Sequence, residues 1–198
     1  MIRKAEKLGV NCEEVELTDT FVNGVMDIYN DSPIRRGKRF WHFGKNFESV
    51  RADLSLDTDA AIFIGAYCNG ELLGFVKLLH NGTSAMITLI LDKISVRDRP
   101  VMNSLISQAV SSCAKRSIKH LTYTLWRRGD HGSFQARNGF IPTPIPEYFV
   151  PLSYRGAAAL RLRIHRGGTA LMPKGLYEIL LRLRTSWYKL TLKAPAHE

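Results

Sequence analysis

The chain has 198 residues, of which 45% are hydrophobic and 23% charged, a composition typical of a soluble globular protein with one main core. Its longest apolar run, 85–91, is far shorter than the roughly 20 residues of a membrane span, and the N-terminal residues lack the apolar core of a signal peptide. We therefore expect a cytoplasmic protein. Three cysteines without paired spacing predict neither a disulfide framework nor a metal site.

Positive charge is concentrated near the C-terminus. The chain has a formal net charge of +10, and from Arg155 onward nine Lys or Arg stand against two Glu. The preceding residues contain nineteen basic side chains against sixteen acidic ones. The C-terminal region is therefore the part of the chain that favours an anionic partner.

The first 60 residues predict a strand at 12–17 and two helices. Thr18 and Asp19 can cap the first helix, and the second covers about 46–56. The loop between the helices contains four basic residues beside the aromatic run 40–43. Such a cluster can bind an anionic ligand through its cations while the aromatic rings stack on the ligand. Alternatively, it is a solvated basic turn whose aromatic side chains fill the core.

Two Asn-Gly dipeptides at 69–70 and 81–82 separate apolar runs and predict tight turns with positive φ at their central residues. The runs 61–67, 71–80 and 83–92 then form an antiparallel meander. The apolar spacing of 101–113 predicts a helix that begins at Pro100, and 120–126 alternates as a strand. A helix between two strands favours a parallel crossover, so the third and fourth strands should be parallel neighbours.

Three segments, in this order, resemble the GCN5-related N-acetyltransferase (GNAT) superfamily. They are the hairpin NGELLGFVKL, the strand-loop-helix LILDKISVRDRPVMNSLISQAV, and FQARNGF at 134–140, which is similar to a late helix ending FYxxxGF. The resemblance implies an α+β fold of three layers, with a mixed sheet of meander and parallel crossover between helices. It places the GNAT-like domain at 1–153 and a basic amphipathic extension at 154–198.

The resemblance implies acetyl-CoA, or another acyl-CoA, as the donor. In this family the loop and helix start after the third meander strand receive the pyrophosphate on backbone N–H groups. Arg97 matches the start of the family pattern Q/RxxGxG/A, whereas its glycine positions are Pro100 and Met102. The implied cofactor-binding residues are Lys93, Ile94, Ser95, Val96, Arg97, Asp98, Arg99, Val101, Met102, Asn103 and Asn138.

Acyl transfer to an amine needs a group that removes the amine proton. Asp92, at the end of the third meander strand, is the candidate base, or it caps the loop and pairs with Lys93 or an Arg. Tyr123 is a second candidate for proton transfer, or a packing residue. The alignment with FYxxxGF puts Gln135 where the family has Tyr.

The C-terminal segments predict an edge strand and a helix. The segment EYFV is predicted to form an extended edge strand, because it is flanked by Pro142, Pro144, Pro146 and Pro151. Residues 174–193 predict a basic amphipathic helix that lies on an anionic membrane surface, or packs on the body or a second subunit. No nucleic-acid recognition motif accompanies the basic residues.

The layout is similar to GNAT-like proteins associated with bacterial cell-surface glycan biosynthesis. This similarity implies an N-acyltransferase that modifies an amino sugar or another glycan precursor, peripheral to the cytoplasmic membrane face. Its acceptor would lie on the early loop, at Arg36, Trp41, His42 and Lys45. Two alternatives stay open: a non-catalytic GNAT-fold module that binds an anionic glycan, lipid or protein, and a transferase that uses aminoacyl-tRNA.

Overall fold

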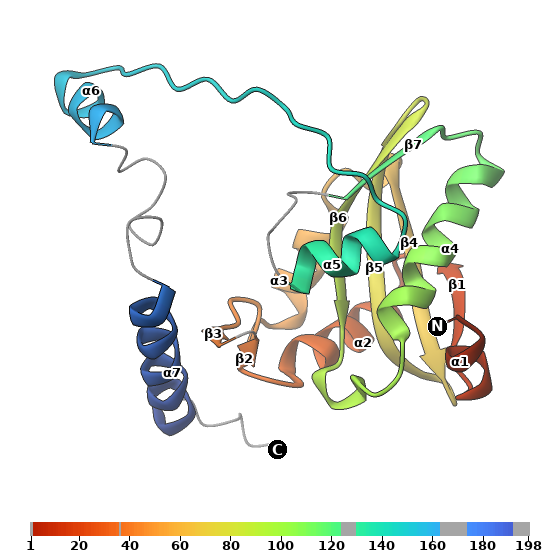
Figure 1. Cartoon of the computed structure of the whole chain (residues 1–198). Coiled ribbons are helices and arrows are strands. Elements are labelled where there is room, and N and C mark those ends of the chain that lie inside the picture. Colours follow the sequence, from red (N-terminus) through yellow and green to blue (C-terminus); the bar gives the residue numbers. More distant parts are fainter. Residues whose placement is uncertain (1, 36, 124–129, 163–173, 192–198) are drawn as a thin grey trace. The chain divides into compact units, whose positions relative to one another are not determined.

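The structure is a computed structural model that describes residues 2–35, 37–123, 130–162 and 174–191 (Figure 1). The chain divides into two compact units. The sheet unit comprises Met1–Pro33 and Trp41–Ile141, and the basic unit comprises Ile34–Phe40 and Pro142–Glu198. The second unit begins at Pro142 and also takes in Ile34–Phe40, whereas the sequence predicts a boundary after residue 153.

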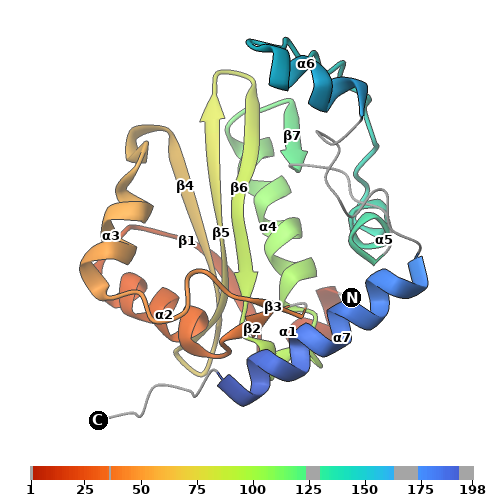
Figure 2. The same cartoon turned by 90° about the vertical axis from the view of Figure 1, so that its left-hand side faces the viewer.

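A five-stranded mixed sheet forms the centre of the sheet unit, in the order β1-β4-β5-β6-β7. All neighbours are antiparallel except β6 and β7, which are parallel (Figure 2). The predicted α+β fold, with its meander and parallel crossover, is therefore confirmed. The strands are β1 (Asn11–Val15), β4 (Ala61–Cys68), β5 (Glu71–Asn81), β6 (Ser84–Asp92) and β7 (His120–Tyr123).

Helices cover both faces of the sheet. Figure 1 shows α2 and α4 on opposite faces of the sheet. Phe21 of α2 packs edge-on against Phe63 and Phe75, whereas α4 packs against the neighbouring side chains that alternate to the opposite face. The helices of this unit are α1 (Ile2–Lys7), α2 (Asp19–Asn30), α3 (Phe47–Ser55), α4 (Val101–Lys115) and α5 (Asp130–Arg137), with 3₁₀ turns η1 (Thr58–Ala60) and η2 (Ile94–Val96).

Local sequence signals account for most of these boundaries. The side chain of Thr18 accepts a hydrogen bond from Phe21 N at 3.2 Å, and so caps α2 as predicted. At the first hairpin, Asn69 and Gly70 both have positive φ, of 52° and 81°. The second turn differs from the prediction, because Asn81 is the last residue of β5 and only Gly82 has positive φ.

The basic unit contains a hairpin that the sequence did not predict. Strand β2 (Ile34–Arg35) pairs with β3 (Lys38–Arg39), and α7 (Lys174–Thr191) contacts both strands. Arg184 of α7 donates a hydrogen bond from Nη2 to the carbonyl oxygen of Gly37 at 3.2 Å. The helix predicted over 174–193 is thus present over 174–191 and packs on the hairpin, and its last two residues lie outside the described part of the chain.

The predicted edge strand at 147–150 is wrong. Residues 141–151 have no regular secondary structure, and a short helix α6 (Tyr154–Arg161) follows. The prolines on both sides of EYFV lack the N–H groups that a strand ladder needs. The segment leaves Ile141, Tyr148 and Leu152 at least 83% exposed. No helix in the described part of the chain is long and apolar enough to cross a membrane.

Candidate functional site

The loop between β6 and α4 ends in a helix start without a side-chain cap. Pro100 occupies the N-cap position of α4 and makes no side-chain bond to the helix. Within this loop, most backbone N–H groups bond to carbonyl oxygens or to a side chain of the protein. Among the described residues, those of Asp98, Met102 and Asn103 have no such partner. They form a set of donors at the positive end of the helix dipole.

Asp31, just after α2, holds the beginning of this loop. Its Oδ2 accepts hydrogen bonds from the backbone N–H groups of Ile94 and Ser95, and its Oδ1 accepts one from Ser95 Oγ at 2.8 Å. Two of the predicted cofactor-binding amides therefore serve an internal carboxylate instead. Sequence reasoning missed Asp31, because no local pattern signals a partner 63 residues away.

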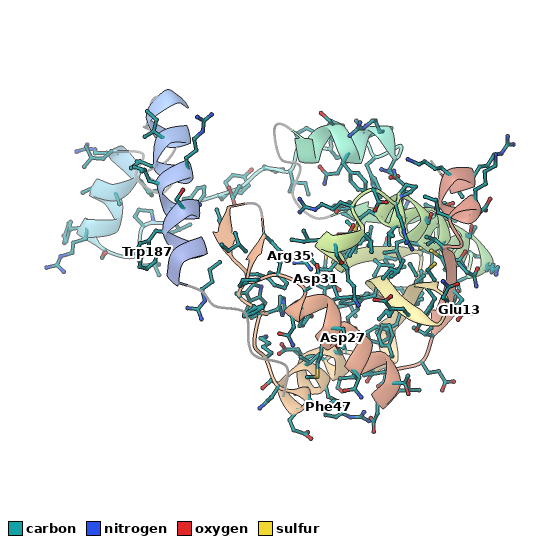
Figure 3. All side chains as sticks on the ribbon, turned by 90° about the horizontal axis from the view of Figure 1, so that it is seen from below. Glu13, Asp27, Asp31, Arg35, Phe47 and Trp187 are labelled. Atoms are coloured by element: carbon teal, nitrogen blue, oxygen red, sulfur yellow. The ribbon has the colours of Figure 1, made fainter. Side chains whose placement is uncertain are left out.

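The neighbouring residue Asn30 holds a different loop. Its Oδ1 accepts a hydrogen bond from Gly44 N at 2.9 Å, in the predicted acceptor loop. Adjacent residues at the end of α2 thus bind the acceptor loop and the β6–α4 loop, and Figure 3 shows Asp31 at this end of the helix. The two predicted binding loops share one anchor.

The basic side chains of the β6–α4 loop are not all directed to one site. Lys93 forms an ion pair with Glu71, with Nζ and Oε1 2.5 Å apart. Arg99 donates from Nη1 to Cys68 Sγ at 3.3 Å, so it is turned towards the end of β4. Arg97 is exposed. Of the three cations that the sequence placed here, Arg97 is the one that solvent and ligands reach most readily.

Gly74 lets α4 approach the sheet closely. A Cβ atom at Gly74 would lie 2.8 Å from Val101 Cγ1 and 2.9 Å from the carbonyl oxygen of Leu91. Val101 is the first residue of α4 and is fully buried. Gly74 of β5 therefore fixes the position of the helix start against β5 and β6.

A groove with a volume of about 660 Å³ continues from the first turn of α4. Asn103 donates from Nδ2 to Asn138 Oδ1 at 3.1 Å across this groove, so the structure brings these two predicted cofactor residues together. The volume lies within the range of small-molecule sites. The lining residues are Ile2, Asn103, Ile106, Ser107, Val110, Ser111, Phe134, Arg137 and Asn138.

The two predicted catalytic residues lie at different positions along the strand direction of the sheet. Asp92 is its last residue and pairs with Gly74, whereas Tyr123 of β7 lies beside Ile87. Five residues of strand correspond to about 16 Å, so the structure does not bring Asp92 and Tyr123 into one reaction centre. The Tyr123 ring contacts that of Phe140 edge-on, with centroids 5.3 Å apart. This contact agrees with a packing role for Tyr123.

The acceptor loop forms an aromatic stack that runs from the core to the surface. His42 is 6% exposed and lies between the ring of Tyr29 at 4.2 Å and that of Trp41 at 3.9 Å. Trp41 is 70% exposed, and Lys45 Nζ lies 3.9 Å from its ring centroid while it also pairs with Asp53. Three predicted acceptor residues are therefore together, and Arg36 lies outside the described residues.

Comparisons with known proteins decide the fold. Three similar structures are a GNAT family acetyltransferase from Staphylococcus aureus (12% identity, TM-score 0.52), the PaiA N-acetyltransferase from Thermoplasma acidophilum in complex with coenzyme A (17%, 0.50), and an aminoglycoside acetyltransferase from an uncultured soil metagenomic sample in complex with sisomicin (8%, 0.55). The chain has the GNAT fold.

The GNAT fold accounts for most of this chain and nearly all of the similar ones. The three comparisons cover 72%, 67% and 74% of this chain, and 98%, 89% and 99% of the other chains, in the same order. No family model and no curated protein matches the sequence. The GNAT fold is therefore recognised here from the arrangement of elements rather than from overall sequence identity.

Proposed function

We propose that the protein is an N-acyltransferase that uses acetyl-CoA or another acyl-CoA. The observation that carries this proposal is the start of α4, where the N–H groups of Asp98, Met102 and Asn103 have no partner among the described residues. Free N–H groups and the helix dipole favour an anion such as a pyrophosphate, and Arg97 adds an exposed cation. A similar acetyltransferase of the same fold contains coenzyme A, which supports this donor.

The groove beyond Asn103 would hold the rest of the donor. Its lining is partly apolar, with Ile106, Val110 and Phe134, and its polar groups include those of Asn103 and Asn138. An apolar groove with a few polar groups is the usual form of a cofactor site.

Asp92 is the carboxylate that we assign to proton removal. In the reaction an amine nitrogen forms a bond to the acyl carbon, the carbon–sulfur bond breaks, and the amine loses a proton. Asp92 ends β6 directly before the loop that Asp31 holds. Gln135, at the position of the family's Tyr, is 1% exposed and carries no acidic proton. The thiolate therefore takes its proton from another donor or from water.

The acceptor we propose is an amino sugar or another amine-bearing glycan precursor. Sugars commonly stack on exposed aromatic rings, and the Trp41 indole is exposed beside the Lys45 ammonium group. The anchor shared by Asn30 and Asp31 supports the placement of this loop beside the donor loop. One similar structure is an aminoglycoside acetyltransferase in complex with sisomicin.

Calorimetric titration of the purified protein with acetyl-CoA and with CoA tests the donor. We expect saturable binding that weakens at least tenfold in Asn103→Asp, because this change puts a negative charge at the anion site while the helix start tolerates it. Gln108→Glu is the matched control, since it makes the same amide-to-acid change on α4 outside the groove. Equal affinity in both variants would place the donor elsewhere.

Contacts of the β6–α4 loop also support a second candidate function, which is binding without catalysis. Asp31 takes the amides of Ile94 and Ser95, and Gln135 replaces the acidic side chain of the family, which together favour a non-catalytic GNAT-fold module that binds an anionic ligand. If millimolar acetyl-CoA and CoA give no heat signal, the acyltransferase proposal fails and this one takes its place.

A further inference from the structure

The entire net charge of the chain belongs to the basic unit. Residues 34–40 and 142–198 contain thirteen Lys or Arg and three Glu, whereas the sheet unit contains fifteen basic and fifteen acidic residues. A neutral sheet unit beside a basic unit of net charge +10 is the pattern expected when one part of a protein binds a polyanion.

Helix α7 of this unit carries an exposed apolar stripe. Ile179, Leu183 and Trp187 are 55%, 62% and 60% exposed, and their four-residue spacing puts them on one side of the helix. Figure 3 labels Trp187 on this helix. Arg184 makes the hydrogen bond to the hairpin. The three side chains of the stripe thus remain more than half exposed while α7 contacts β2 and β3.

The apolar stripe of α7 and the positive charge of the basic unit together indicate the kind of partner. A nucleic acid would neutralise the cations but leave the three apolar side chains in water. A membrane-spanning role is excluded for α7, since no helix among the described residues is long and apolar enough. An anionic lipid surface satisfies both features, because apolar side chains enter the boundary below the headgroups while Lys and Arg meet the lipid phosphates.

We propose that α7 binds the surface of an anionic membrane. Ile179, Leu183 and Trp187 insert below the headgroups, and the exposed cations Arg182, Lys38 and Arg39 of the same unit lie at the level of the phosphates. This interaction needs neither an acyl donor nor an acceptor, so it holds or fails independently of the proposed function.

Co-sedimentation of the full chain with vesicles tests the proposal. We expect the protein to sediment with vesicles of phosphatidylglycerol and phosphatidylcholine and to stay in solution with pure phosphatidylcholine. Raising the salt concentration to about 1 M shortens the screening length to roughly 3 Å and should weaken the binding. Equal sedimentation with both vesicles, or none with either, would overturn the proposal.

Variants on exposed positions separate the stripe from the charge. Replacing Ile179, Leu183 and Trp187 together by Gln, which favours helices, should weaken vesicle binding at least tenfold. Arg182→Gln should weaken it about fivefold, the effect of one basic residue near an anionic surface. Leu56→Gln is the control, because Leu56 is 64% exposed and lies in the neutral sheet unit.

Two further outcomes would overturn the membrane proposal in favour of another partner. Light scattering that shows a dimer in the wild type and a monomer in the Gln triple variant, with vesicle binding unchanged, would assign the stripe to a second copy of the chain. Tight binding of tRNA that is unaffected by the triple variant, without binding to vesicles, would assign the basic unit to nucleic acid.

Insertion of Trp187 can be tested directly with brominated lipids, which quench tryptophan fluorescence. Stronger quenching in the wild type than in Trp187→Phe would support insertion of Trp187.

Discussion

At the scale of single residues, carboxylates bind parts of the chain that lie far apart in sequence. Asp31 connects the end of α2 with the β6–α4 loop, and Glu14 of β1 connects with Arg116 after α4. The two differ in chemistry. Asp31 accepts from backbone N–H groups and a hydroxyl, whereas Glu14 accepts from both Nη atoms of a guanidinium group. Each carboxylate can be replaced by an amide of nearly the same size.

Asp31→Ala should weaken acetyl-CoA binding at least tenfold, because the backbone N–H groups of Ile94 and Ser95 lose their acceptor and the loop loses its position. Asp31→Asn should lie between this variant and the wild type, since its Oδ1 can still accept one bond. Calorimetry measures both. Asp27→Asn, on an exposed position of the same helix, is the control. Tighter binding in Asp31→Ala would instead show that Asp31 competes with the ligand for these amides.

The Glu14–Arg116 pair should make stability depend on pH. The hydrogen bond from Arg116 lowers the pKa of the Glu14 carboxyl below its ordinary value. A lowered folded-state pKa adds stability above the unfolded-state pKa, and this stability is lost as the pH falls through the folded-state value. Glu14→Gln should cost about 0.5–1 kcal/mol at pH 7, because both side chains are partly exposed, and nothing in strong acid.

Urea denaturation of the wild type and Glu14→Gln between pH 3 and pH 7 measures this dependence. The neighbouring Glu13→Gln serves as the control, because no hydrogen bond or ion pair involving the Glu13 side chain is found among the described residues. A constant difference between wild type and Glu14→Gln over this pH range would show that the pair contributes through packing and not through charge.

At the scale of elements, the approach of α4 to the sheet depends on the absence of one side chain. Both neighbours of a Cβ atom at Gly74 are rigid, since Val101 Cγ1 belongs to a β-branched side chain and the Leu91 oxygen belongs to the backbone. An added methyl group therefore moves the helix start, and with it the set of unpaired N–H groups.

Gly74→Ala should lower the free energy of unfolding by about 1–3 kcal/mol, the usual cost of overpacking, and weaken acetyl-CoA binding in parallel. Gly175→Ala is the matched control: no heavy atom lies within 4 Å of its added Cβ, and Ala favours the helix. Urea denaturation and calorimetry give the two values. If Gly74→Ala binds the donor as the wild type does, the position of α4 does not control the site.

The sequence predicted those elements whose signals are local. The first Asn-Gly turn, the cap of α2 and the apolar runs of β4 to β6 depend on only a few neighbouring residues, and the structure confirms these elements. The β2–β3 hairpin escaped prediction because each strand has two residues and the turn depends on Gly37, with a φ of 68°. The strand at 147–150 was wrong because the prolines around it were interpreted as a sign of an edge strand, although they lack the N–H groups that a strand ladder needs.

For the candidate site too, the sequence predicted the local features and missed the long-range contacts. The resemblance located the β6–α4 loop and the pair Asn103 and Asn138, which the structure brings within hydrogen-bond distance. Asp31 was missed, and Arg99 was assigned to the site although it donates to Cys68. Sequence patterns identify which backbone forms a loop, but long-range packing decides which side chains face into it.

At the scale of the whole molecule, an exposed extended segment follows the sheet unit. Residues 142–153 are all exposed, and they include Tyr148 and Leu152 at 86% and 94%. Brief digestion with chymotrypsin should therefore cut first within this segment and leave a fragment that contains all five strands of the sheet. Mass spectrometry identifies the fragment, and Tyr148→Ser together with Phe149→Ser should slow the first cut. First cuts inside β4 to β6 would contradict this division of the chain.

The shared anchor of the two loops has a consequence for the binding of the donor and the acceptor that we propose. Asn30 and Asp31 are consecutive, so a ligand that shifts the loop around Gly44 also moves the residue that holds Ile94 and Ser95. Binding free energies are then linked, and linkage is reciprocal: the factor by which the donor changes acceptor affinity equals the factor by which the acceptor changes donor affinity. The end of α2 is where that factor is set.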